Sequence, residues 1–267
     1  MKKTFKPLIM LLTALGLLSF AVIVIYILVM GIPSIDSSIF AWEYNSENHS
    51  LMAPMITTLV TIVLTLLIAL PLGIFTAIYT SSYARSKLIV NLVSFTSEIL
   101  AAIPSIVYGL FGYLAFVIFL KMEFSIISGC LTLMIMVLPT IIRTSQEAIA
   151  TVNNLQRDAS LALGATKLTT IFRIILPEAL PGILAGVFLS VGRIVGETAA
   201  LVYTMGTYVS MPSNIMKSSR TLAVHMFQLS SEGLYVDKAY ATAVVLLIFV
   251  IIVNAVSNKL ANKLIKE

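Results

Sequence analysis

The stretch Asp158–Pro177, DASLALGATKLTTIFRIILP, separates two long apolar segments and carries the most informative pattern in the chain. Its apolar residues recur at roughly helical spacing, which predicts an amphipathic helix rather than a disordered loop. Asn153 or Asn154 can cap the start of this helix, and Gly164 can end it in a left-handed conformation. The stretch therefore predicts a helix, a glycine stop and a second helix.

The apolar segments on either side indicate a membrane protein. Of the 267 residues, 59% are hydrophobic and 11% are charged, whereas a soluble domain carries about 25% charged residues. We therefore predict an all-α polytopic membrane protein in which Pro177 and Pro181 break the helix before the fifth span begins. Six apolar segments are long enough to cross a bilayer: 8–30, 55–79, 99–120, 125–142, 182–206 and 238–258.

The basic residues predict the orientation of these spans. The first apolar segment exceeds the length of a signal-peptide core and no small-residue cleavage site follows it, so we expect a retained helix. With both termini in the cytoplasm, four basic residues face outward: Lys121, Lys217, Arg220 and Lys238. Twelve lie inside, as the positive-inside rule requires: Lys2, Lys3, Lys6, Arg85, Lys87, Arg143, Arg157, Lys167, Arg173, Lys259, Lys263 and Lys266.

The stretch Asp158–Pro177 also resembles the EAA loop of ABC-importer permeases. In that loop E-A-A is followed by three residues, a glycine, nine residues and I-x-L-P. The spacing matches here from Asp158 through Gly164 to Pro177, with Asp in place of Glu and Ser in place of the second Ala. The resemblance implies a coupling helix that seats in an ATPase groove; the alternative is an ordinary interfacial helix on the membrane surface. The implied coupling residues are Asp158, Ala159, Ser160, Leu161, Ala162, Gly164 and Ala165.

Two further stretches narrow the resemblance. IPSIVYGLFG (103–112) and GRIVGETAALVYTMG (192–206) are similar to the phosphate-specific permeases, and to one of the two paralogous permease chains of that system more than to the other. This implies the MetI-like fold of a type I ABC-importer permease subunit. We expect an N-terminal helix and first external loop over 1–50, and a permease core over 51–262 with a cytoplasmic coupling loop at 143–181.

The resemblance also implies what this subunit works with. The expected partners are a PstC-like permease chain, a PstB-like ATPase dimer that holds ATP and Mg, a PstS-like phosphate-binding protein on the outer face, and membrane lipid, with no nucleic acid. The dipeptide Gly-Lys of the phosphate-binding loop never occurs, so we expect the chain not to hydrolyse nucleotide through that motif. No Ser/His/Asp or metal-ligand constellation is visible either, so we expect a subunit that is not an enzyme and binds no cofactor and no metal. The expected location is the bacterial cell membrane.

Two charges interrupt the fifth predicted span. Counted along a helix from Gly182, Arg193 and Glu197 lie roughly 16 and 22 Å in, near the middle of a bilayer. Four residues apart, they can share one helix face and neutralise each other. Alternatively Arg193 contacts a passing oxyanion and Glu197 accepts its proton or pairs with the arginine, because intramembrane charges are usually functional. Further candidate pathway residues are Thr198, Ser105 and Tyr108.

Small and polar residues suggest how the spans pack. Gly182, Gly186, Gly192 and Gly196 form two G-x-x-x-G pairs, which predict close helix packing either within this chain or against the partner permease. Thr57, Thr58, Thr61 and Thr65 approximate one helix face and favour interhelical hydrogen bonding over ion contact. Cys130 is expected to be a small buried hydrophobe, and His49 and His225, far apart in the sequence, receive no ligand role.

Three other functions compete with a phosphate importer. One is a permease for another oxyanion, such as phosphonate, sulfate or molybdate. A proton-coupled secondary transporter would use Arg193 and Glu197 as a relay, but it would leave the EAA-like loop unexplained and no internal repeat is visible. A membrane scaffold would have no use for charges inside a span. The sequence therefore favours the permease subunit of an ATP-driven phosphate importer.

Overall fold

A computed structural model describes residues 2–45 and 47–266, and its regular elements are helices. Short 3-10 helices (η1, η2) and π-helical turns (η3–η5) extend or connect the α-helices. In chain order the elements are α1 (Lys2–Gly31), η1 (Ile32–Ser34), η2 (Ser37–Phe40), α2 (Met52–Ile78), η3 (Tyr79–Tyr83), α3 (Lys87–Ala102), α4 (Ser105–Gly112), η4 (Tyr113–Phe119), α5 (Ile126–Thr151), α6 (Asn154–Ala162), α7 (Lys167–Thr170), η5 (Ile171–Ile175), α8 (Leu176–Gly196), α9 (Ala199–Thr204), α10 (Leu222–Glu232) and α11 (Val236–Lys266).

Within residues 2–45 and 47–266 the helices provide five candidate membrane spans, or six if a bent pair of helices counts as one. Five are single helical segments that are long and apolar enough to cross a bilayer, and the sixth is a pair, α3 and α4 with η4, bent by 102° at a short break. The prediction of an all-α membrane protein is confirmed, with six spans if the bent pair counts as one. The single spans are Phe5–Ser34, Met52–Tyr83, Ile126–Thr151, Lys167–Gly196 and Val236–Lys259.

The third span differs from the expected continuous segment 99–120. Its first helix begins already at Lys87 and stops at Ala102, and a new helix starts at Ser105. Pro104 explains the break, because the residue before a proline is disfavoured in the helical region. Ile103 accordingly takes an extended conformation, with φ −69° and ψ 130°.

The fifth span was placed wrongly at both ends. It was expected to begin after Pro181, yet helix runs from Lys167 through η5 to Gly196. Pro177 lies at the start of α8, directly after the π-helical turn η5, so its missing N–H falls where the helix changes its hydrogen-bonding pattern. Pro181 is tolerated inside the helix because its neighbours Ala179 and Ile183 are buried in an apolar cluster with residues of α2 and α5. At the other end, the helix stops ten residues before Gly206.

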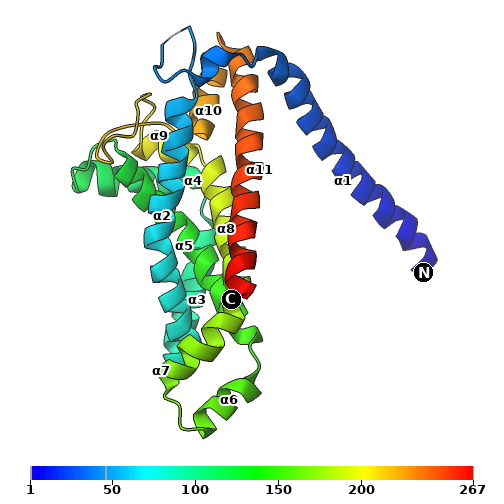
Figure 1. Cartoon of the computed structure of the whole chain (residues 1–267), viewed down its shortest axis with the longest axis vertical. Coiled ribbons are helices and arrows are strands. Elements are labelled where there is room, and N and C mark those ends of the chain that lie inside the picture. The colour runs from blue at the N-terminus through cyan, green and yellow to red at the C-terminus, as the bar shows by residue number, and fades with distance from the viewer. Residues whose placement is uncertain (1, 46, 267) are drawn as a thin grey trace.

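The core of the bundle forms around α5. This helix packs against α2, α8, α3, α4 and α9, and its inward face is fully buried at Leu133, Met136 and Val137. By contrast α1 stands away from the bundle and meets it near its own C-terminal end (Figure 1). Gly31 permits that contact, since a Cβ there would lie 2.5 Å from the Tyr240 carbonyl oxygen on α11.

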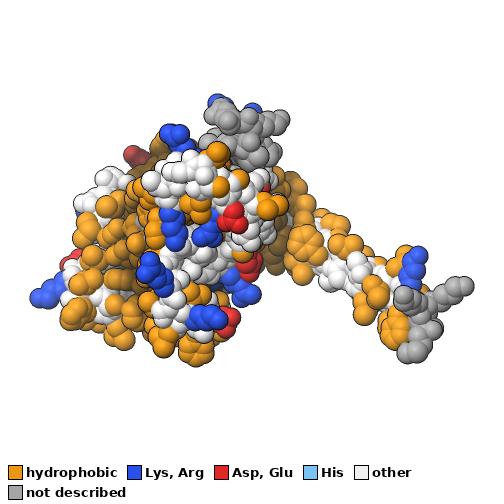
Figure 2. Space-filling view, turned by 90° about the horizontal axis from the view of Figure 1, so that it is seen from below, with side chains coloured by type: hydrophobic (Ala, Val, Ile, Leu, Met, Phe, Trp, Pro, Cys, Tyr) orange, Lys and Arg blue, Asp and Glu red, His pale blue; other side chains and the backbone are white. Residues whose placement is uncertain are grey.

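The two ends of the bundle differ in architecture. The loops around η1, η2 and α10 cover one end, while α6 and α7 project from the other (Figure 1). Seen from below, the α6–α7 end carries many lysine and arginine side chains among apolar ones (Figure 2). By the positive-inside rule this is the end we predict to be cytoplasmic.

Candidate functional site

The apolar stretch 182–206 is broken at Glu197 and Thr198. Glu197 has an extended backbone, with φ −74° and ψ 131°, between the end of α8 and the start of α9. Its Oε1 atom accepts a hydrogen bond of 3.0 Å from the N–H of Ala200. The carboxylate therefore caps the short helix α9, a role that the continuous-helix prediction missed.

The expected helix-face pairing of Arg193 with Glu197 is wrong. Arg193 belongs to the last turn of α8 rather than to the middle of a helix, and Glu197 has already left helical geometry. Among residues 2–45 and 47–266 these two side chains form no ion pair with each other. A cation in the last turn instead compensates the partial negative charge of the helix C-terminus. Arg193 is half-buried beside the break.

The bent pair α3–α4 packs directly against this break. A Cβ on Gly109 of α4 would lie 2.9 Å from the Ala200 Cα, so only glycine allows α4 and α9 to approach this closely. The Tyr108 hydroxyl donates a hydrogen bond of 2.6 Å to the carbonyl of Leu100, which fastens α4 to α3 across the bend. Tyr108 is buried, and Ser105 is half-buried at the start of α4. Of these two pathway candidates, Tyr108 thus has a positioning contact within the chain.

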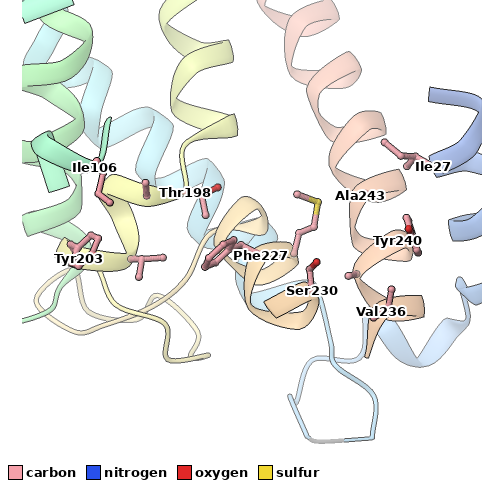
Figure 3. A pocket seen from close by; sticks show the side chains of 13 residues that line it. Ile27, Ile106, Thr198, Tyr203, Phe227, Ser230, Val236, Tyr240 and Ala243 are labelled. Atoms are coloured by element: carbon pink, nitrogen blue, oxygen red, sulfur yellow. The ribbon is translucent and has the colours of Figure 1, made fainter. Parts of the chain in front are cut away.

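A cavity of about 620 Å³ lies next to Thr198. Figure 3 shows Ile106, Thr198 and Tyr203 on one side of it, Val236, Tyr240 and Ala243 on the other, and Phe227 and Ser230 of α10 between them. Most of the lining is apolar, and Thr198 supplies one of its few hydroxyls. The structure thus places Thr198 on a cavity, while Arg193 and Glu197 do not line it.

The four glycines of α8 have different surroundings. A Cβ on Gly182 would lie 2.6 Å from the Ala148 Cβ, and one on Gly186 would lie 2.7 Å from the Thr144 Cβ, both on α5. A Cβ on Gly192 or Gly196 would meet nothing within 4 Å. The first pair therefore packs within this chain, and the second pair leaves an open strip of backbone beside Arg193.

The threonine face of α2 forms hydrogen bonds to another element, as predicted. Thr57 Oγ1 lies 2.7 Å from Ser219 Oγ, and Thr58 Oγ1 accepts a 3.0 Å hydrogen bond from the N–H of Leu222. All four threonines are buried. Thr57 and Thr58 anchor the segment before α10 to the second span, whereas Thr61 donates to the Thr57 carbonyl within α2.

The helix of the EAA-like loop forms as the sequence predicts. Asn153 caps α6 by accepting from the N–H of Leu155 at 2.9 Å, and Gly164 follows the helix with φ +83°. Inward, Ser160 Oγ lies 2.9 Å from Thr170 Oγ1 of α7. Of the remaining predicted coupling residues, Ala165 is half-buried. The others are exposed: Asp158, Ala159, Leu161, Ala162 and Gly164.

Large apolar side chains stand in solvent around α6. The exposed fractions are 74% for Leu155 and 89% for Leu163, at the two ends of the helix. Large exposed apolar side chains on a helix outside the spans are candidates for contact with a partner. The helix α6 itself lies at the free end of the bundle (Figure 1).

A polar cluster at the opposite end escaped the sequence analysis. Tyr44, His49, Arg220 and His225 meet there, although Tyr44 and Arg220 are 176 residues apart. His49 and His225 are 176 residues apart in the sequence, and their spacing gave no signal of this meeting because it depends on how the first outer loop packs against α10.

Several helices long and apolar enough to cross a membrane, packed around α5 and broken at a buried carboxylate, define a multi-pass membrane protein. The chain belongs to the family described as binding-protein-dependent transport system inner membrane component, whose model matches residues 69–266. The prediction of this family and fold is confirmed.

Curated relatives include the probable ABC transporter permease protein YqgI of Bacillus subtilis, 32% identical over 200 residues, which cover 69% of this chain and 68% of that protein. The phosphate transport system permease protein PstA of Xylella fastidiosa is 36% identical over 165 residues, covering 61% of this chain and 58% of that protein. The match thus spans less than two thirds of the Xylella protein.

Solved permease structures share the fold. A chain of the MetNI methionine ABC transporter in an inward-facing conformation aligns with a TM-score of 0.63 and 21% identity, covering 78% of this chain and 91% of that one. A chain of a bacterial ABC transporter that imports the acidic polysaccharide alginate aligns with a TM-score of 0.65 and 18% identity, covering 95% of both chains. These alignments support the MetI-like fold.

Proposed function

We propose that this chain is the PstA-type permease subunit of an ATP-driven importer of inorganic phosphate. The observation that carries the proposal is the break at Glu197, which lies with a half-buried Arg193 and a carboxylate that caps α9 inside an otherwise apolar stretch. Non-helical backbone at membrane depth is tolerated where it is buried in protein or lines a water-filled path. The similarity to proteins named PstA supports phosphate as the substrate.

Arg193 has the chemistry for a transient phosphate contact. A guanidinium offers a planar set of donors that matches two oxygens of an oxyanion, and it stays charged at all physiological pH values. The open backbone at Gly192 and Gly196 lets an ion, or the second permease chain, approach the same face. Glu197, 8% exposed, places a negative charge four residues away, which weakens the net attraction and helps the anion to leave.

The α6 surface would connect this site to ATP hydrolysis in a partner. The proposed partners are a PstC-like permease chain, a PstB-like ATPase dimer that binds ATP and Mg, and a PstS-like binding protein. Exposed Leu155 and Leu163 suit an apolar groove on the ATPase. Movement of α6 would reach the site through the Ser160–Thr170 contact, because Thr170 lies on the continuous helical segment Lys167–Gly196 that carries Arg193.

Phosphate uptake by an Arg193→Gln variant tests this proposal. Glutamine keeps a polar hydrogen-bonding side chain, although a shorter one, and removes the charge; charge-assisted hydrogen bonds contribute about 1.5–3 kcal/mol. We expect phosphate uptake to fall about tenfold or more, with the chain still inserted in the membrane. Lys217→Gln, the same loss of charge at an exposed outer-loop position, is the matched control and should transport normally. Uptake by Arg193→Gln at the control rate would refute the role of Arg193.

A further inference from the structure

Arg220 is a buried cation at the end of the bundle opposite α6. Its side chain is 5% exposed and lies between three segments that the sequence separates widely. Nε donates to His225 Nδ1 on α10 at 3.0 Å, one terminal nitrogen donates to the Thr207 carbonyl at 3.3 Å, and the other donates to the Tyr44 hydroxyl at 3.3 Å.

The backbone around Arg220 is fixed independently of these contacts. Ser219 is hydrogen-bonded to Thr57, and the N–H of Leu222 donates to Thr58, so both flanking positions are attached to α2. Thr221 caps α10 by accepting from the N–H of Val224. The position of the guanidinium is therefore set by the fold before any ligand is present.

The charge of Arg220 is not neutralised by the groups around it. Within the described ranges 2–45 and 47–266, no carboxylate lies within 4.0 Å of it. His225 accepts from Arg220 through Nδ1, so its imidazole is a neutral acceptor, and the Tyr44 hydroxyl is also hydrogen-bonded to Nδ1 of His49 at 3.3 Å. An arginine cannot release its proton to relieve burial, and isolated buried charges are costly.

Arg220 also borders an open cavity of about 480 Å³. A guanidinium has five N–H groups, and the three contacts above use one on each nitrogen, which leaves two donors on the terminal nitrogens. Gln228 and Tyr208 add polar groups to the cavity wall. Glu232 lies on the exposed rim, where its carboxylate accepts from the Gln228 amide at 3.2 Å.

We infer that this cavity binds a small tetrahedral oxyanion, with Arg220 as its principal ligand. The fixed geometry, the uncompensated charge and the two free donors together match a phosphate-type oxyanion better than a neutral solute. The choice of inorganic phosphate rests on the proposed function. In a transporter for that ion, the cavity would be a second phosphate site, separate from Arg193, at the end predicted to face outward.

Binding of radiolabelled inorganic phosphate to the purified full-length chain in a maltoside detergent tests the inference. We expect Arg220→Gln to weaken phosphate binding about tenfold or more, from the loss of charge-assisted hydrogen bonds. Lys217→Gln, an exposed cation on the same connecting segment, should bind as the wild type does. Equal phosphate binding by Arg220→Gln and Lys217→Gln overturns the inference.

A second variant keeps the test independent of folding, because Arg220 also joins three segments. Glu232→Gln changes the exposed rim and leaves every contact of Arg220 in place. Removing this negative charge should strengthen phosphate binding about threefold, the scale of one exposed charge several ångströms away. Unchanged or weaker binding contradicts the site.

Two further comparisons separate the possible outcomes. Arg193→Gln should lower phosphate uptake about tenfold or more while phosphate still binds at Arg220. Normal uptake by Arg193→Gln refutes the proposed role of Arg193 but leaves the Arg220 result standing. If short-chain phosphatidylglycerol displaces phosphate at an equal or lower concentration, the cavity takes a lipid phosphate and the inference of a site for free phosphate is wrong.

Discussion

Gly186 and Gly192, six residues apart on α8, allow a matched test of how this helix packs. Alanine at either position removes the flexibility of glycine and should favour the helix by up to about 1 kcal/mol. At Gly192 the new methyl group meets nothing within 4 Å. At Gly186 it would lie 2.7 Å from the Thr144 Cβ and press against the Thr144 hydroxyl.

The contact at Gly186 cannot relax freely. Thr144 is β-branched and therefore has few alternative rotamers, and its hydroxyl donates to the Thr140 carbonyl at 2.8 Å. Overpacking of this kind costs about 1–3 kcal/mol. The gain in helix propensity from Gly to Ala is the same in both variants, so it cancels when the two are compared. Gly186→Ala should therefore be less stable than Gly192→Ala by about 1–3 kcal/mol.

Thermal unfolding of the two purified variants in the same detergent measures this difference. On the scale of globular proteins of this size, 1 kcal/mol shifts Tm by about 2–4 °C. Gly186→Ala should therefore melt at least about 2 °C below Gly192→Ala. Equal melting temperatures, or a higher one for Gly186→Ala, would show that α8 does not pack on α5 through Gly186.

Four other changes have defined outcomes. Leu163→Glu should abolish co-purification with the ATPase while membrane insertion persists, because Leu163 is 89% exposed and has no packing to lose; retained co-purification contradicts the α6 surface. Asn153→Ala should lower uptake through a frayed α6, at about 1 kcal/mol for a lost cap, and Asn153→Asp should restore it. Glu197→Ala should destabilise the chain by about 1–3 kcal/mol in unfolding assays, since the buried N–H of Ala200 loses its acceptor, and unchanged stability argues against the cap. Burial, assisted by the Arg220 charge, lowers the pKa of His225 to about 3. Between pH 6.5 and 5 the unfolded state therefore takes up a proton at this histidine and the folded state does not, which should lower the free energy of unfolding by about 2 kcal/mol. Unfolding measured across this pH range should detect the loss, and His225→Gln should remove it.

Local sequence signals predicted the cytoplasmic coupling segment well. Asn153 and Gly164 are strong markers because few residue types can replace them. The Asn153 side chain accepts from an N–H that has no partner within the helix, and Gly164 adopts a positive φ. Such tasks depend on neighbours in sequence and not on the rest of the fold.

The helix break at Glu197 could not be predicted in the same way. Apolar composition and the four-residue spacing both favoured a continuous helix with Arg193 and Glu197 paired. The break depends on α9 packing across Gly109 of α4, a contact between spans that hydropathy does not encode. Pro181 was predicted to break the helix, but it lies inside α8. Burial of the neighbouring Ala179 and Ile183 against residues of α5 outweighs the hydrogen bond that the proline removes.

The polar cluster around Arg220 shows the same limit. Its members come from two loops and α10, and each looked like an ordinary loop residue by itself. Thr57 and Thr58 were correctly predicted to form hydrogen bonds between elements, but their partners, the segment around Arg220, could not be identified from the spacing.

The central claim is that this chain forms half of an ATP-driven path for phosphate. The most direct measurement is accumulation of radiolabelled phosphate in proteoliposomes that contain the chain with its partner permease, the ATPase and the binding protein. We predict accumulation that requires ATP and that excess sulfate, molybdate or phosphonate does not suppress. Accumulation without ATP, no accumulation of phosphate, or transport of one of the other anions in its place would contradict the account.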